Sequence, residues 1–357
     1  MAWHLGELKM SINDVDKSLL SDTEIKTGST ILDIKNFSKW FPIMNSWNRQ
    51  KGWLKALDNV SMTVNKGEII GVVGESGCGK STLGKTIMGI HQLTEGSVNF
   101  EGSEIGHLTP SQSRQLRRRL QYTYQDPGSS LDPRWKIGRS LHEPLEIHTN
   151  LNKEERHKRV KAILNAVNLP EAHLDLYPHE ISGGQQRRIG LARILTLHPS
   201  LIILDEPTSG LDVSVQATIL TLFLELQKQF NLTYIFISHD LSVVRMICDR
   251  VAVMYLGKIV EINETEKLFS NPKHPYTQSL LSAIPVIGGD KVTENFWLEG
   301  EPPNPSNLPS GCSFRTRCPK QTEECSRASP PLVKQKTGHE VSCFNASTPV
   351  SYTHLTL

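Results

Sequence analysis

The stretch GESGCGKSTL, residues 74–83, decides how the rest of the chain is interpreted. Its first eight residues fit the pattern G-x-x-x-x-G-K-[ST], in which glycines let consecutive backbone N–H groups point at the phosphates of a nucleotide. The apolar run GEIIGVVG at 67–74 predicts a buried strand before the loop, and residues 80–90 have the composition of a helix. Strand, loop and helix in this order are the context that a P-loop requires.

A P-loop here assigns roles to particular side chains. We expect Lys80 to reach the β- and γ-phosphates of ATP and the Ser81 hydroxyl to bind Mg²⁺. Cys78 is expected to be a small residue of the loop rather than a reactive thiol. A chance glycine-rich turn is the alternative, and the flanking strand and helix argue against it. The residues expected to contact the nucleotide are Gly74, Glu75, Ser76, Gly77, Cys78, Gly79, Lys80, Ser81 and Thr82.

The run LIILDEP at 201–207 has the features of the second half of such a site. It is apolar, as a buried strand is, and it ends in two carboxylates. We expect Asp205 to bind Mg²⁺ and Glu206 to accept a proton from, or to orient, the attacking water. Because many strands end in acidic residues, this motif alone is weak evidence for a nucleotide site. It becomes strong evidence together with the P-loop upstream.

A second phosphate-binding helix start is predicted at ISGGQQRR, residues 181–188. Ser182, Gly183, Gly184 and Gln185 open a helix whose N–H groups are free of side-chain bulk. A chain with a complete P-loop does not need a second site for its own nucleotide, so these residues are expected to contact the ATP of another chain. The run resembles the signature of the ATP-binding cassette (ABC) family, with Ile181 where leucine is commoner.

This resemblance extends over about residues 30–262 and implies further roles. Gln125 is similar to the glutamine that contacts Mg²⁺ and the attacking water, and His239 to the switch histidine at the γ-phosphate. Asp212, in SGLD, resembles a residue of the loop through which two cassettes meet. Phe41, next to Trp40, is expected to stack on adenine. Each of these side chains is a structural residue in the alternative interpretation, and their order and spacing favour the functional one.

The fold class that the resemblance implies is α/β: a RecA-like P-loop NTPase core with an antiparallel β-subdomain and an inserted helical subdomain. Two cassettes would close head to tail, with each ATP held between the P-loop of one chain and the signature of the other. The expected parts are a flexible N-terminus at 1–29, the ATP-binding domain at 30–265 with helices inserted at about 110–197, a C-terminal extension at 266–345, and a disordered or non-native tail at 346–357.

The extension contains HPYTQSLLSAIP at 274–285 and a Pro- and Cys-rich segment at 299–343. It resembles the C-terminal extension of oligopeptide and dipeptide importer ATPases, some of whose relatives handle nickel or other small solutes. The cysteines follow C-x5-C-x6-C-x17-C, which suits a [4Fe–4S] cluster or a structural Zn²⁺, with the cluster favoured by the resemblance. Four reduced, buried thiols are the alternative. The cysteines concerned are Cys312, Cys318, Cys325 and Cys343.

The charge and the apolar runs of the chain limit which kinds of partner are expected. The net charge is +2, and the basic run LRRRL at 116–120 is typical of a solvated helix face, so nucleic acid is not expected. The apolar runs are too short to cross a bilayer, and no secretory signal is evident. We therefore expect a peripheral subunit on the cytoplasmic face of the plasma (inner) membrane. Its expected partners are a second ABC ATPase subunit, two integral membrane permease subunits and an extracellular or periplasmic solute-binding protein; a non-transport ABC ATPase is the rival.

Overall fold

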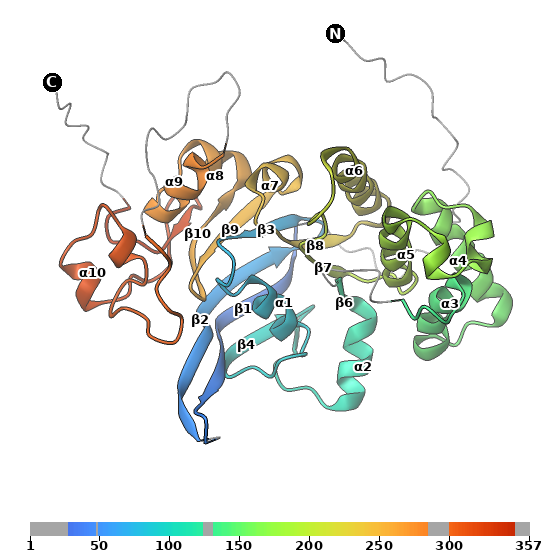
Figure 1. Ribbon diagram of the computed structural model, residues 1–357, viewed down its shortest axis with the longest axis horizontal. Coiled ribbons are helices and arrows are strands. Elements are labelled where there is room, and N and C mark those ends of the chain that lie inside the picture. The colour runs from blue at the N-terminus through green and yellow to red at the C-terminus, as the bar shows by residue number, and fades with distance from the viewer. Residues whose placement is uncertain (1–27, 48, 124–130, 285–299, 347–357) are drawn as a thin grey trace, which may run out of the picture.

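The computed structural model describes residues 28–47, 49–123, 131–284 and 300–346, and Figure 1 shows its elements. Two β-sheets lie side by side, with helices over the larger one and at both ends of the molecule. The expectations for the first 27 residues, for the tail from 347 onward and for Gln125 fall outside the described residues.

The larger sheet is parallel at its centre, where the P-loop strand β3 lies between β9 and β8. The strands β8, β7 and β6 continue in parallel, whereas β10, β12 and β11 extend the other side in antiparallel fashion. The order is β11 (Val333–Lys334), β12 (Glu340–Val341), β10 (Lys258–Glu264), β9 (Arg250–Tyr255), β3 (Ile69–Val73), β8 (Thr233–Ile237), β7 (Leu201–Asp205) and β6 (Leu120–Thr123).

The smaller sheet is antiparallel, and its long hairpin projects from the body of the molecule in Figure 1. At the far end of this hairpin Met44 pairs with Gln50. Several register shifts interrupt the pairing, as expected for a long, twisted two-stranded ribbon. The order is β2 (Gln50–Asn65), β1 (Thr30–Met44), β4 (Glu95–Phe100) and β5 (Ser103–Glu104).

Ten α-helices and three 3₁₀-helices are described (Figure 1). The α-helices are α1 (Lys80–Ile87), α2 (Pro110–Arg119), α3 (Ile137–His148), α4 (Lys153–Ala166), α5 (Gly183–Leu195), α6 (Val213–Phe230), α7 (Leu241–Ile247), α8 (Thr265–Ser270), α9 (Pro275–Ser282) and α10 (Glu324–Arg327). The 3₁₀-helices are η3 (Glu171–Asp175), η4 (Pro178–Glu180) and η5 (Arg315–Arg317). No helix among the described residues is long and apolar enough to span a membrane.

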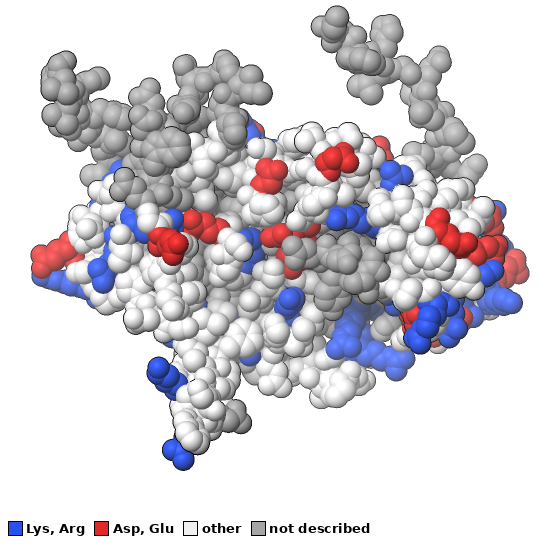
Figure 2. Space-filling view, viewed as in Figure 1, with Lys and Arg blue, Asp and Glu red and all other residues white. Residues whose placement is uncertain are grey.

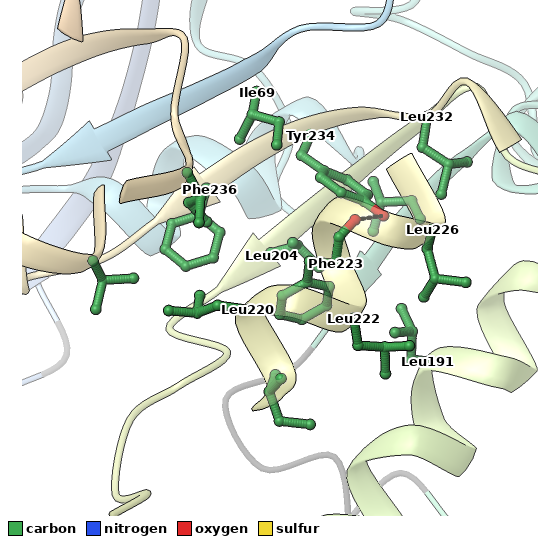
Figure 3. Close-up of a cluster of buried hydrophobic side chains, with 14 of the residues drawn as sticks. Ile69, Leu191, Leu204, Leu220, Leu222, Phe223, Leu226, Leu232, Tyr234 and Phe236 are labelled. Atoms are coloured by element: carbon green, nitrogen blue, oxygen red, sulfur yellow. Dashed lines mark hydrogen bonds between the residues drawn. The ribbon is translucent and has the colours of Figure 1, made fainter. Parts of the chain in front are cut away.

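Successive side chains of the central strands point to opposite faces of the sheet and belong to two separate hydrophobic cores. On one face Ile70 and Val72 join the inner residues of the smaller sheet, and Leu83 of α1 is buried between the two sheets. On the other face Ile69 and Val73 pack under the helices. Figure 3 shows part of this second core, where Phe223 and Leu220 of α6 lie against β7 and β8 and the Tyr234 hydroxyl donates to the Phe223 carbonyl. Both faces of β3 are therefore buried, which explains its uninterrupted apolar run.

The segment predicted to be helical from about residue 110 contains one exception. Strand β6 (Leu120–Thr123) pairs in parallel with β7 at the end of the larger sheet. Four residues are too few to establish an alternating pattern, so this strand was not predicted. The preceding helix, α2, ends in Arg117, Arg118 and Arg119, and none of its ten residues is buried. Figure 2 shows Lys and Arg side chains gathered on the surface in the region of α2, and the lack of buried residues in α2 agrees with a solvated face.

Candidate nucleotide-binding site

The P-loop joins β3 to α1 at the carboxyl edge of the larger sheet. At two positions of the loop only glycine fits the backbone. Gly74 has φ 152°, and Gly79, the N-cap of α1, has φ 110°. A Cβ at Gly74 would lie 2.2 Å from the Met254 carbonyl oxygen, and one at Gly79 would lie 2.5 Å from the Ala56 carbonyl oxygen. The loop therefore needs glycine at both positions to pass between β2 and β9.

The tip of the P-loop is exposed to solvent, whereas Cys78 within the loop is buried. Ser76 and Gly77 are exposed, and a Cβ at Gly77 would meet no heavy atom within 4 Å. Cys78 is buried, and burial raises the pKa of its thiol. This matches the expectation of a small, unreactive loop residue. Thr82 lies in the first turn of α1, where its carbonyl accepts from the Thr86 hydroxyl at 2.7 Å.

The Lys80 side chain is held inside the loop that it is expected to serve. Its ammonium donates to the carbonyl oxygens of Gly74 at 2.8 Å and Glu75 at 3.0 Å, and the residue is only 5% exposed. An ammonium fixed among the N–H groups at the start of a helix provides the charge that a phosphate needs.

Ser81 and Asp205 meet as the sequence predicts, although they are 124 positions apart. The Ser81 hydroxyl donates to Asp205 Oδ1 at 3.0 Å. The phenol of Tyr122 donates to Asp205 Oδ2 at 2.5 Å, so both carboxylate oxygens have a partner. A hydroxyl and a buried carboxylate are the hard oxygen ligands that Mg²⁺ prefers, so these side chains fit a magnesium site.

Because Tyr122 orients the Asp205 carboxylate, Tyr122→Phe is expected to raise the Mg²⁺ concentration for half-maximal ATP hydrolysis by about tenfold, the usual scale for a lost outer partner of a metal ligand. The measurement is a magnesium titration of phosphate release at saturating ATP. Tyr234→Phe is the matched control, since that buried phenol contacts only the Phe223 carbonyl in the core. An unchanged magnesium dependence in Tyr122→Phe would remove Tyr122 from this role.

Glu206 and His239 approach each other where β7 and β8 end. His239 Nδ1 lies 3.4 Å from Glu206 Oε1, and the imidazole is the more exposed of the two, at 60% against 21%. Glu206 adopts φ 48°, which is unusual for a residue with a side chain, and its N–H donates to the Ile237 carbonyl at 2.9 Å. Backbone strain of this kind is concentrated at functional sites.

The start of α5 faces solvent. Ser182 is the N-cap, accepting from the Gln185 N–H at 3.3 Å, while the Gln185 side chain accepts from the Ser182 N–H at 2.9 Å. Ser182 and Gly183 are exposed, and a Cβ at Gly183 or Gly184 would meet nothing within 4 Å. None of the hydrogen bonds found among the described residues joins these four positions to the P-loop of the same chain.

The loop that contains Asp212 is attached to the same helix. Arg187 of α5 donates to the carbonyls of Pro207 at 2.7 Å and Ser209 at 2.9 Å. Asp212 is the N-cap of α6, and its pKa is lowered, first by the hydrogen bond from the Val215 N–H. The Asp212 carboxylate therefore stabilises α6, and the loop before it is exposed at Gly210.

The proposed adenine contact lies on β1. The Phe41 ring meets His91 edge-on at 5.2 Å, and the Lys39 ammonium lies 4.8 Å from its centre. Phe41 is half-buried, whereas the Trp40 ring lies tilted against that of Trp53, with ring centres 6.4 Å apart. Phe41 thus has a ring surface that the core does not use. Its role in stacking stays a prediction.

The C-terminal extension is attached to the cassette through a buried carboxylate. Glu261 of β10 is fully buried and accepts from His339 Nε2 at 2.6 Å and from the N–H groups of Lys273 and His274 at 2.7 and 3.0 Å. Asn263 contacts the other imidazole nitrogen of His339 at 3.1 Å. Glu261 therefore holds the start of α9 through two N–H groups, and His339, the residue before β12, through its imidazole.

Burial lowers the pKa of His274 to about 4, against the weaker opposing effect of Glu261. Between about pH 6.5 and 4 the unfolded chain therefore binds a proton that the folded chain does not, so stability falls as the pH falls through this window, by up to about 1.4 kcal/mol per pH unit. His274→Asn keeps an N-cap for α9 without a titrating group. Urea unfolding at pH 7.5 and 5.0 should show a smaller loss of stability in this variant; an equal loss would contradict the assignment.

The four cysteines of the extension are reduced and lie near one another. Burial raises the pKa of Cys312 and Cys343, and that of Cys318 to about 11, with the neighbouring cysteines adding to the effect. Among the described residues, which include Cys325, no group of three or more ligating side chains is placed to hold a metal ion. The structure gives no support to the predicted [4Fe–4S] cluster or Zn²⁺.

Three contacts of this site were not predicted from the sequence. Tyr122, three residues before Gln125, binds the predicted magnesium ligand Asp205. Tyr276 and Arg317 of the C-terminal extension both reach Glu75 of the P-loop. No local pattern marks these residues, because their significance depends on positions more than 80 residues away.

Two family models match the chain: "ABC transporter" over residues 57–209, and "Oligopeptide/dipeptide transporter, C-terminal region" over residues 260–325. The chain is 47% identical over 318 residues to the oligopeptide transport ATP-binding protein AppF of Bacillus subtilis (strain 168), covering 88% of this chain and 97% of AppF. It is 44% identical to the di/tripeptide transport ATP-binding protein DppF of Pseudomonas aeruginosa (strain UCBPP-PA14), covering 89% and 98%.

Two solved structures show the same cassette fold. CbiO1 from Clostridium perfringens, part of an ABC transporter complex, matches with a TM-score of 0.60 and 28% identity over 68% of this chain and 91% of that chain. The ATP-binding cassette MJ0796, described as a dimer in a post-hydrolysis state with ADP and Pi, matches with a TM-score of 0.58 and 27% identity over 66% and 98%. With these matches, the chain belongs to the ABC transporter family, among the ATP-binding proteins that carry the oligopeptide/dipeptide transporter C-terminal region.

Proposed function

We propose that this chain is the ATP-hydrolysing subunit of a prokaryotic importer of oligopeptides or dipeptides. One observation carries the proposal: a fixed ammonium, a magnesium-type ligand pair and a carboxylate beside an imidazole meet at one sheet edge. These are the groups that phosphoryl transfer to water requires. The peptide cargo is inferred from relatives that are named for peptide transport and from the extension that the chain shares with them.

In this proposal each residue has one task. The P-loop N–H groups and Lys80 bind the phosphates of ATP, and Glu206 accepts a proton from the attacking water while His239, 3.4 Å away, contacts the γ-phosphate. Ser81 and Asp205 would hold Mg²⁺, which neutralises phosphate charge when it is bound. Phe41 would stack on adenine, and Gln125 would contact the magnesium and the water. The catalytic residues proposed are Glu206, His239 and Gln125.

We propose that the start of α5 serves the nucleotide of a second ATPase subunit. Ser182, Gly183, Gly184 and Gln185 are open to solvent or partly so, and helix N–H groups favour phosphate. The loop from Ser209 to Asp212 would meet the same partner, since Arg187 ties it to α5. Cassette MJ0796, a 27% identical relative, is described as dimeric. ATP would hold two such subunits together and hydrolysis would release them.

The permease contact is proposed at a cavity of about 520 Å³ beside α5. Its wall includes Leu191 and Ile194 of α5, and its margin includes Ile90 and Ile147, both 47% exposed. An apolar recess with exposed isoleucines suits a short amphipathic helix of a membrane partner. The subunit would then be peripheral on the cytoplasmic face of the plasma membrane.

The full assembly proposed contains two ATPase subunits, two permease subunits and a solute-binding protein outside the membrane. Within the chain we propose residues 30–265 as the ATP-binding domain, with its helical subdomain at about 110–197, and 266–345 as the extension. The proposal includes ATP and Mg²⁺.

The test is co-purification. The tagged protein is isolated from mildly solubilised membranes of its native host, and the proteins that accompany it are identified by mass spectrometry. Two polytopic permeases with a peptide-loaded binding protein are the expected result. A binding protein loaded with nickel or another small solute would change the cargo, and ribosomal or DNA-repair partners in place of permeases would overturn the transport role.

A further inference from the structure

The P-loop is in contact with a residue near the far end of the chain. The Arg317 guanidinium donates two hydrogen bonds to the Glu75 carboxylate, at 2.8 and 3.1 Å. The Arg317 side chain is 5% exposed and that of Glu75 is 26% exposed. Glu75 is the second residue of the P-loop, and Arg317 lies 242 positions later in the C-terminal extension. A two-pronged, largely buried pair of this kind is much stronger than a surface salt bridge.

A second contact from the extension fixes the backbone of the same residue. The Glu75 N–H donates to the phenol oxygen of Tyr276, on α9, at 2.9 Å. Tyr276 is fully buried, with its ring 4.6 Å from that of Tyr255 and 5.5 Å from that of Phe314. The Arg317 guanidinium lies 6.0 Å from the Tyr255 ring. Both the main chain and the side chain of Glu75 are therefore held by one packed aromatic group and the arginine beside it.

The charge of Glu75 makes this arrangement important for phosphate binding. The Glu75 carbonyl lies 3.0 Å from the ammonium of Lys80, the group expected to contact the phosphates. A carboxylate on the loop that receives a polyphosphate repels it, and the repulsion is strong where water is partly excluded. In the folded chain Arg317 compensates the Glu75 charge. Without the extension, the P-loop would present an uncompensated negative charge to its ligand.

We propose that Arg317 is a positioning residue for nucleotide binding, and that the C-terminal extension completes the P-loop by neutralising and orienting Glu75. This rests on the proposed function, because it assumes that the P-loop binds ATP. It makes ATP affinity depend on how the extension docks. A change in the extension, wherever it arises, is thereby transmitted to the nucleotide through one ion pair and one hydrogen bond.

The test is equilibrium binding of ATP to the purified full-length chain. Arg317→Ala should weaken ATP binding about tenfold or more, since it leaves the Glu75 carboxylate unpaired. Arg317→Lys should lie between this variant and the wild type, because lysine keeps the charge and loses the two-pronged geometry. In steady-state hydrolysis the loss should appear mainly in KM rather than in kcat.

The decisive variant is the pair Glu75→Gln with Arg317→Ala. The pair should recover most of the affinity that Arg317→Ala loses, because glutamine carries no charge that repels the phosphates. The defect of Arg317→Ala should also shrink at high salt, which screens the repulsion. If the pair binds no better than Arg317→Ala, or if Arg317→Ala binds as the wild type does, the proposal is overturned.

Folding is checked separately. Arg327→Ala removes an exposed arginine that pairs with Glu323 inside the extension, and it should leave ATP affinity unchanged. Thermal unfolding of every variant shows whether the fold is intact. If Arg317→Ala is unfolded, ATP binding is compared in Arg317→Lys and Tyr276→Phe instead. Wild-type affinity in both of these variants would overturn the proposal. Lys80→Ala shows how much ATP affinity is lost when a phosphate contact of the P-loop is removed directly. A wild-type chain that binds no ATP would instead refute the proposed function.

Discussion

Glu206→Gln is expected to bind ATP as tightly as the wild type and to hydrolyse it at least about a hundredfold more slowly, the usual effect of removing a positioned general base. Glutamine keeps the size of the side chain but cannot accept a proton from water. The substitution should not disturb the backbone, because the strained φ of 48° is held by the bond from the Glu206 N–H to the Ile237 carbonyl. The measurements are ATP binding at equilibrium and phosphate release at saturating ATP.

The same variant should accumulate as an ATP-bound dimer, visible by size-exclusion chromatography with Mg²⁺ and ATP, because the step that releases the two subunits no longer occurs. Glu225→Gln is a suitable control, since Glu225 is an exposed carboxylate on α6. Normal turnover in Glu206→Gln would remove Glu206 from its proposed role. Slow turnover combined with lost ATP affinity would indicate a damaged site instead of a missing base.

The second large effect is expected from Lys80→Ala, which should weaken ATP binding by about a hundredfold. Two charge-assisted hydrogen bonds of about 1.5 kcal/mol each are sufficient for a loss of this size. The Lys80 ammonium is nearly fully buried, and its removal also leaves the carbonyls of Gly74 and Glu75 without this donor. Equilibrium dialysis with ATP measures the change directly.

Lys85→Ala is the matched control for Lys80→Ala, because both lysines belong to α1 and only Lys80 faces into the loop. The control should bind ATP like the wild type. If both variants lose affinity to the same extent, the effect comes from α1 as a whole and not from the phosphate contact. Retained affinity in Lys80→Ala would place the nucleotide elsewhere.

The central part of the fold could be predicted because local patterns determine it. The apolar runs that became β3 and β7 are buried on both faces, and the P-loop between β3 and α1 has glycine where only glycine fits. Ser81 and Asp205 were each expected to bind Mg²⁺ from their own motifs, and the structure brings them within hydrogen-bonding distance. These inferences need only short-range sequence information.

Other features depended on packing that sequence periodicity does not reveal. Strand β6 is four residues long, and the pairing of Arg317 with Glu75 joins segments that no local rule connects. The cysteine spacing suggested a metal site, but spacing alone does not establish whether the side chains are directed at a common centre, and the described residues contain no group of three or more ligating side chains so placed. His339, beside the last cysteine, lies instead against the buried Glu261.

The place of β3 in the larger sheet has a consequence for synthesis of the chain. Ile69 pairs with Tyr234, and Ile70 pairs with Arg250, so both neighbours of the P-loop strand are translated long after it. At about 5–20 residues per second, roughly 8 to 35 seconds pass before these neighbours exist. During that interval ATP has no finished site to bind and cannot stabilise the nascent chain. The emerging apolar strand β3 must be shielded by other means until the ribosome has delivered β8 and β9.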